Sequence, residues 1–329
     1  MSESEPNQVA ELARKLCQGE RRALARAITL VESTRADHQA EARLLLDCIL
    51  PHTGKAVRVG ISGVPGVGKS TFIDVFGARL VESGKRVAVL AIDPSSSISG
   101  GSILGDKTRM PRLTALENAF VRPSPSRGSL GGVARRTREA LLLCEASGYD
   151  VILIETVGVG QSEYAVAAMV DVFLLLMLAG AGDELQGIKR GILELADVVA
   201  ITKADGDNEP RAESARAEFK AALRLLRGSA PGAAPEVVTV SAVEQRGIDS
   251  VWDSILQHRQ RLESSGELAQ KRARQQKAWL HNLLEDSLKE RFFAQPAVRA
   301  ALPGIEAAVD GGEITPTEGA RRLLELLDD

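Results

Sequence analysis

The central part of the chain alternates between two patterns of apolar residues, one typical of strands and one typical of helices. Short apolar runs, which indicate buried strands, lie at residues 57–61, 86–92, 120–122, 151–155, 172–178, 198–201 and 237–240. Between most of them, apolar residues recur at helical spacing, at residues 70–83, 133–146, 163–169, 211–226 and 248–262. This alternation predicts an α/β fold in which a mostly parallel sheet is covered by helices on both faces.

Both ends of the chain show helical spacing without strand-like runs. Near the N-terminus this spacing covers residues 9–16, 21–33 and 40–50. Residues 267–293 form a long charged segment, and breaker residues should divide the tail beyond it into short helices: Pro296, Pro303, Gly304 and Pro316. We therefore expect three regions: an N-terminal helical extension at 1–56, an α/β domain at 57–262 and a C-terminal helical arm at 263–329. The arm either binds a second copy or another partner, or covers the α/β domain.

A glycine-rich motif follows the first predicted strand and precedes a predicted helix. It fits the phosphate-binding pattern G-x-x-x-x-G-K-[ST] and consists of Gly63, Val64, Pro65, Gly66, Val67, Gly68, Lys69, Ser70 and Thr71. Glycines let backbone N–H groups wrap a triphosphate, and the positive end of the following helix faces the anion. Lys69 should reach the β- and γ-phosphates, and the Ser70 hydroxyl should bind Mg²⁺. The motif predicts a P-loop nucleotidase domain at residues 57–262.

Acidic residues end two of the strand-like runs, at the edge where parallel sheets bind ligands. Asp93 follows the run 86–92, and its carboxylate would either contact Mg²⁺ or cap the next turn. Glu155 ends the run 151–155 and would hold Mg²⁺ through water. Glycines follow at Gly158 and Gly160, which is typical of a switch loop whose Gly158 N–H senses the γ-phosphate. Gln161, a candidate catalytic residue, would either orient the attacking water or only hydrogen-bond the loop.

Two further segments are rich in glycine and lack a clear period. Residues 95–112 are interpreted either as a loop that the nucleotide orders or as a solvated loop, and their charged or hydroxyl cluster is Asp106, Lys107, Thr108 and Arg109. Residues 180–190 form either a mobile link between nucleotide and partner or an exposed helix start, and their polar residues include Asp183, Glu184, Gln186 and Lys189.

A guanine-reading pattern, [NT]-K-x-D, occurs at residues 202–205, directly after a strand-like run. The Asp205 carboxylate can accept hydrogen bonds from guanine N1–H and N2–H₂, whereas adenine offers neither donor there. The aliphatic stem of Lys203 can lie against the base. Ser241 and Ala242, after the run 237–240, match the last nucleotide element, in which a backbone N–H reaches guanine O6.

Composition excludes several functions. Aromatic residues make up 3% of the chain and the net charge is −3, so we expect neither a base-stacking platform nor a polyanion-binding surface, and hence no nucleic-acid partner. The longest apolar run is too short to span a bilayer, and the first residues are too polar and acidic for a signal peptide. This short run leads us to expect no membrane partner. The three cysteines are widely separated, which favours a reducing, cytoplasmic location.

Taken together, these motifs resemble the MeaB/ArgK family of GTPases. The residues that carry the resemblance lie at 63–71, 93–96, 105–110, 155–163 and 202–205, and it extends over nearly the whole chain. The resemblance implies a SIMIBI-class P-loop G domain, GTP/GDP and Mg²⁺ as cofactors, and a homodimer formed by the C-terminal arm. Mg²⁺ contacts would fall on Ser70, Asp93, Asp106 and Glu155. Residues 180–190 would be a third switch, in which Lys189 contributes to hydrolysis.

The family resemblance also implies a partner. Its members are GTP-dependent metallochaperones that assemble with adenosylcobalamin-dependent methylmalonyl-CoA mutase, gate loading of the cofactor and protect the mutase from inactivation.

Other classes of nucleotide-binding protein fit the sequence less well. A kinase would need a dedicated base near an acceptor pocket, a nickel chaperone would need clustered cysteines or histidines, and a protein-targeting GTPase would need a methionine-rich domain. None of these features is visible in the sequence.

Overall fold

The computed structural model describes residues 4–92, 110–122, 130–156, 162–180, 190–227 and 234–327. The chain divides into two compact units, Met1–Arg272 and Ala273–Asp329. The first unit holds the N-terminal helices together with the α/β domain. The three regions expected from the sequence remain a prediction.

The described residues form one seven-stranded sheet in the order β3-β2-β4-β1-β5-β6-β7, and every strand pairing in it is parallel. This confirms the predicted parallel α/β fold. The strands are β1 (Val57–Gly63), β2 (Val87–Ile92), β3 (Ala119–Arg122), β4 (Val151–Thr156), β5 (Val172–Leu178), β6 (Val198–Thr202) and β7 (Glu236–Thr239).

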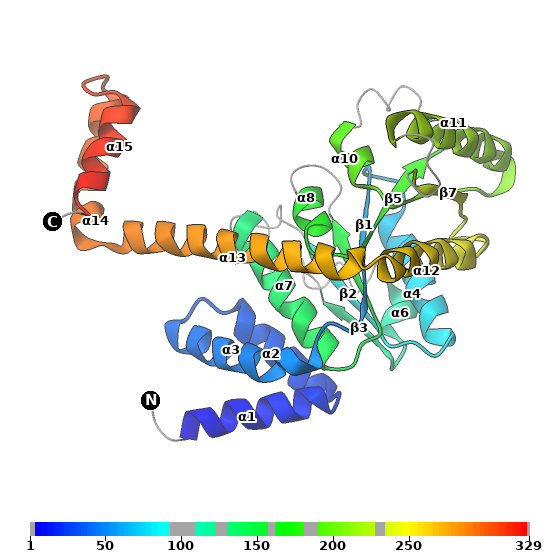
Figure 1. Cartoon of the computed structure of the whole chain (residues 1–329), viewed down its shortest axis with the longest axis horizontal. Coiled ribbons are helices and arrows are strands. Elements are labelled where there is room, and N and C mark those ends of the chain that lie inside the picture. The colour runs from blue at the N-terminus through cyan, green and yellow to red at the C-terminus, as the bar shows by residue number, and fades with distance from the viewer. Residues whose placement is uncertain are drawn as a thin grey trace. The chain divides into compact units, whose positions relative to one another are not determined.

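Helices cover both faces of this sheet (Figure 1). The helices of the first unit are α1 (Ser4–Cys17), α2 (Arg21–Glu32), α3 (Ala36–Ile49), η1 (Leu50–His52), α4 (Lys69–Glu82), α6 (Pro111–Thr114), α7 (Leu130–Ala146), α8 (Ser162–Ala167), α10 (Arg190–Leu195), η2 (Gly206–Asn208), α11 (Glu209–Arg227) and α12 (Ile248–Ser264). Helix α13 (Glu267–Ala294) begins in this unit and ends in the second. Helix α2 packs against α7, which joins the N-terminal helices to the α/β domain.

The strands are mostly apolar because most of their residues are buried between the helices on the two faces of the sheet. All residues of β1 and β6 are buried. On one face, Phe72 and Phe76 of α4 pack with strand residues such as Ile61. On the other, Phe219 of α11 packs with Met177 of β5. None of the described helices combines the length and the hydrophobicity that a bilayer-spanning helix requires.

The second unit shows one departure from the sequence expectation. Helix α14 (Pro296–Asp310) continues through Pro303 and Gly304, which were expected to end it, and α15 (Pro316–Glu325) follows. A proline inside a helix removes one backbone hydrogen bond. Here packing offsets that loss: a Cβ added at Gly319 of α15 would lie 3.0 Å from Ile305 and 3.3 Å from Val309, so the two helices lie close together.

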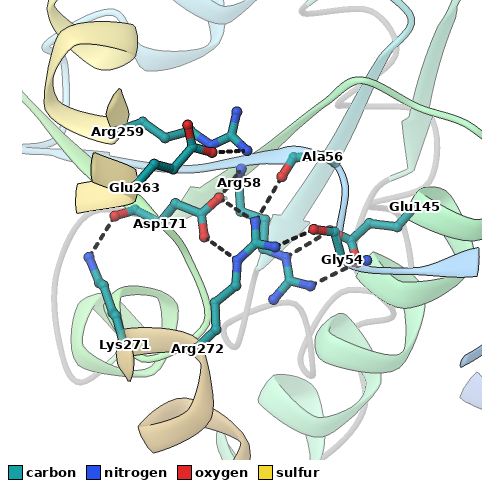
Figure 2. A network of polar contacts seen from close by, with 9 residues as sticks. All are labelled: Gly54, Ala56, Arg58, Glu145, Asp171, Arg259, Glu263, Lys271 and Arg272. Atoms are coloured by element: carbon teal, nitrogen blue, oxygen red, sulfur yellow. Dashed lines mark hydrogen bonds and ion pairs between the residues drawn. The ribbon is translucent and has the colours of Figure 1, made fainter. Parts of the chain in front are cut away.

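A network of buried charges joins the amino-terminal edge of the sheet to α7 and to the first turns of α13 (Figure 2). Asp171, just before β5, is fully buried and accepts two hydrogen bonds from Arg272 at 2.8 and 2.7 Å. Arg272 also donates to the backbone oxygens of Gly54 and Ala56. Arg58 of β1 pairs with the buried Glu145 of α7 at 2.7 Å. This edge is opposite to the one that carries the nucleotide motifs.

Candidate functional site

The predicted nucleotide residues meet along one edge because all strands of the sheet run in parallel. The glycine-rich loop follows β1, Glu155 lies near the end of β4, Lys203 follows β6, and Ser241 follows β7. The carboxyl ends of parallel strands share one edge of the sheet, and ligands bind beyond that edge.

The loop between β1 and α4 has the geometry of a phosphate cradle. Gly66 and Gly68 have φ of 79° and 92°, a left-handed backbone that glycine adopts without a Cβ penalty. Gly68 is the N-cap of α4, so the positive end of this helix faces the loop. A Cβ at Gly63 would lie 2.5 Å from the Leu176 carbonyl oxygen, so the start of the loop admits only glycine without a backbone shift.

Lys69 lies over this loop. Its Nζ donates to the backbone oxygens of Gly63 at 2.7 Å and Val64 at 3.3 Å. Burial lowers the pKa of the Lys69 ammonium group, while the negative charges of Glu155 and Glu163 oppose that shift. The ammonium group is therefore placed where an anion in the loop would stabilise its charged form.

Two of the four predicted Mg²⁺ contacts come together in the structure. The Ser70 hydroxyl of α4 donates to Glu155 Oε1 at 3.0 Å. Glu155 is fixed in register by its neighbours, Ile61 in β1 and Ala91 in β2. The other two predicted contacts, Asp93 and Asp106, lie outside the described residues. Among the residues that are described, no group of three or more His, Cys, Asp or Glu side chains is placed to hold a metal ion.

The predicted switch residues and two of the candidate catalytic residues also lie outside the described residues. These are Lys107, Thr108, Arg109, Gly158, Gly160, Gln161, Asp183, Glu184, Gln186 and Lys189. Their predicted roles stay predictions.

The guanine-reading pattern is anchored to the phosphate loop itself. Thr202 Oγ1 donates to the Val67 backbone oxygen at 2.9 Å and approaches the Met177 oxygen at 3.2 Å. Thr202 therefore connects the predicted base-reading segment to the phosphate loop. The [NT]-K-x-D pattern has a threonine or an asparagine at this position, so the sequence marks residue 202 although it does not show which loop the side chain contacts.

The Ser241 side chain makes contacts that the sequence pattern does not predict. Its hydroxyl donates to Asp205 Oδ2 at 2.6 Å and accepts from the Glu244 N–H at 3.1 Å. The sequence pattern predicts only a backbone N–H contact in this segment. A hydroxyl that links the two loops orients the Asp205 carboxylate, and the other lone pairs of that carboxylate can still accept from guanine.

Comparison with known proteins agrees with this geometry. The model of the family "Methylmalonyl Co-A mutase-associated GTPase MeaB" matches residues 24–297. A "Putative GTPase" of Caulobacter vibrioides is 55% identical over 316 residues, covering 96% of this chain and 97% of the relative. "GTPase ArgK" of Escherichia coli is 48% identical over 319 residues, covering 97% of this chain and 96% of the relative.

Two other relatives extend the comparison. "Methylmalonic aciduria type A homolog, mitochondrial" of Mus musculus is 49% identical over 335 residues, covering 99% of this chain and 81% of the relative. A solved structure named "LAO/AO transport system kinase" matches with a TM-score of 0.76 and 41% identity, covering 100% of this chain and 99% of that one. The chain therefore belongs to the MeaB family, and it is a P-loop GTPase.

Proposed function

We propose that this protein is a Mg²⁺-dependent GTPase chaperone that assembles with adenosylcobalamin-dependent methylmalonyl-CoA mutase, gates loading of its cofactor and protects it from inactivation. The observation that carries the proposal is the joining of a phosphate loop to a guanine-reading segment by Thr202, in a chain that matches the mutase-associated family over residues 24–297. The name of the mouse relative, which refers to methylmalonic aciduria, supports the same partner.

In this proposal the loop 63–71 binds the phosphates of GTP or GDP, and Lys69 neutralises the β- and γ-phosphates. The donor set fits Mg²⁺, since the Ser70 and Glu155 oxygens lie 3.0 Å apart and this ion prefers hard oxygen ligands. The ion would offset the negative charge that develops on the phosphates. Asp93 and Asp106 would complete the set, while Gln161 would position water and Lys189 would assist hydrolysis.

Base selection rests on the loops after β6 and β7. Asp205 accepts from both guanine donors, Lys203 lies along the base, and a backbone N–H at Ser241 or Ala242 reaches O6. A carboxylate already fixed by the Ser241 hydroxyl needs little reorganisation when guanine binds.

The remaining parts of the proposal concern assembly and location. The C-terminal arm makes a homodimer, because Leu280, Leu284 and Leu288 of α13 are 65%, 54% and 56% exposed at a spacing that aligns them on one helix face. The protein acts in the cytoplasm, consistent with its three free cysteines. Neither nucleic acid nor membrane is a partner.

The decisive test is co-purification with the mutase, followed by the GTPase rate as mutase is added. We expect a complex and faster hydrolysis. A Ser70→Ala variant serves as the matched control, because it should lose the acceleration through loss of Mg²⁺ while the chain stays folded. If no complex forms with GTP, with GDP or without nucleotide, the partner assignment is refuted. The protein would then be a GTPase that does not bind the mutase.

A phosphotransferase is the second candidate, because the solved relative carries the name of a kinase. The two candidates differ in where the γ-phosphate goes. Release of all of it as inorganic phosphate, measured with γ-labelled GTP and candidate acceptors, supports the GTPase assignment. Label retained on an acceptor would support the kinase.

A further inference from the structure

Arg246 joins the two base-reading loops, although it belongs to neither of their motifs. It lies between β7 and α12, and its backbone N–H and C=O exchange hydrogen bonds with Ser241 at 3.1 and 3.0 Å. Its guanidinium donates to the Ala204 carbonyl oxygen at 3.1 Å. One residue therefore holds the backbone next to both ends of the Ser241–Asp205 hydrogen bond.

Two carboxylates hold the guanidinium of Arg246 in place. It donates to the two oxygens of Glu209, at the start of α11, at 2.7 and 3.1 Å, and its Nε lies 2.7 Å from Glu244. A forked contact of this kind fixes the plane of the guanidinium group. Because Arg246 and Glu209 are 48% and 50% exposed, the pair should add little to overall stability, and its main effect is on local geometry.

The segment that Arg246 holds is strained. Lys203 has φ of 57° and Gln245 has φ of 55°, a left-handed backbone that is unfavourable for residues with a Cβ. Such a backbone persists only where neighbouring contacts fix it. Asn208 fixes the Lys203 carbonyl by a 2.7 Å hydrogen bond, and Arg246 fixes the next carbonyl, that of Ala204. Loss of the Arg246 contact would let the backbone beside Asp205 relax.

We propose that Arg246 is a positioning residue for guanine selection, acting through Ala204 and Ser241 on the Asp205 carboxylate. The proposal rests on the proposed guanine-reading role of Asp205. Because the contacts described above are with the base-reading loops and α11, Arg246 should affect which base is selected and leave the chemical step unchanged.

The first experiment uses Arg246→Met in the full chain. Affinities for GTP and for ITP, whose base lacks the 2-amino group, are measured by calorimetry, and kcat is measured at saturating GTP. We expect GTP affinity to fall about five-fold, as for one lost hydrogen bond, the GTP-over-ITP ratio to fall about threefold, and kcat to stay within about twofold. Arg216→Met is the matched control. Arg216 and Arg246 both line a pocket of about 220 Å³, but Arg216 pairs with Glu213 of α11, so its GTP-over-ITP ratio should be unchanged.

A second pair of variants separates positioning from stability. Exchanging the charges, with Glu209→Arg and Arg246→Glu together, restores an ion pair but no donor to Ala204; we expect a near-normal unfolding midpoint and a reduced GTP-over-ITP ratio. Arg246→Lys keeps the positive charge but cannot make the forked contact, so its GTP-over-ITP ratio should fall less than that of Arg246→Met. This variant also tests the proposal if Arg246→Met does not fold.

Asp205→Asn tells the two possible failures apart. An amide cannot accept from both guanine donors, so this change should lower selection of GTP over xanthosine triphosphate. If Asp205→Asn leaves selection unchanged, the proposed guanine site is wrong. If it alters selection but the Arg246 variants keep the wild-type GTP-over-ITP ratio, or weaken both nucleotides equally, the role of Arg246 is overturned and the site stands.

Discussion

Lys69 lies partly buried at the phosphate loop, where desolvation lowers the pKa of its ammonium group. A neighbouring triphosphate would favour the charged form and raise that pKa again. The described contacts of its Nζ are to carbonyl oxygens of its own loop, Gly63 and Val64, so removing the side chain disturbs the site more than the core.

We expect Lys69→Ala to weaken GTP binding about a hundredfold or more, because several charge-assisted hydrogen bonds are lost, while the unfolding temperature stays close to wild type. Calorimetric titration with GTP and thermal unfolding check both expectations. Lys85→Ala, at an exposed lysine beyond α4, is the control and should bind GTP normally. Near-normal GTP affinity of Lys69→Ala would contradict the phosphate-loop role.

Among the secondary-structure elements, the first turns of α13 show how a buried ion pair fixes a helix to a sheet. Asp171 is fully buried and Arg272 is 18% exposed, and Asp171 also accepts from the Arg58 N–H at 3.0 Å. Lys271 adds a 2.6 Å hydrogen bond to the Asp171 carbonyl and approaches Asp197 at 3.4 Å. Removing one member of such a buried pair leaves the other charge without its partner.

Arg272→Met should therefore lower the free energy of unfolding of the first unit by about 3 kcal/mol. A Trp279→Phe background leaves Trp252, which packs against Phe76 in the core, as the reporter for denaturant unfolding followed by fluorescence. Arg79→Met is the control, because the Arg79–Asp249 pair is exposed and its loss should leave the midpoint unchanged. Equal midpoints for both variants would argue against a stabilising role of the Asp171–Arg272 pair.

Element boundaries also show the limits of local patterns. The predicted helix at 133–146 begins earlier, at Leu130, and α14 continues through Pro303. Helix ends depend on capping and neighbours, and tertiary packing overrides the preference of a single proline. The apolar runs match the strand bounds more closely, since strands buried on both faces of a sheet are mostly apolar along their length.

The exposed leucines of α13 indicate that the protein associates with a second copy of itself. We expect a homodimer in sedimentation at micromolar concentration, and a monomer after Leu284→Glu with Leu288→Glu, because charges on the stripe oppose burial against a second copy. Glu285→Gln, at an exposed polar position of the same helix, is the control and should remain dimeric. A monomeric wild-type protein would refute dimerisation through the arm.

The parallel α/β fold can be predicted from the sequence alone, and the phosphate-loop and guanine-reading motifs can be recognised in it, because each depends on the period or spacing of nearby residues. How these parts are connected depends on the three-dimensional fold. Thr202 contacts Val67 across 135 positions, and Arg272 contacts Asp171 across 101. The Ser241 hydroxyl and the Arg246 guanidinium likewise gain their roles from partners 36 and 42 positions away, Asp205 and Ala204. Local sequence patterns do not identify such distant partners, because these residues come within hydrogen-bonding distance only when the chain folds.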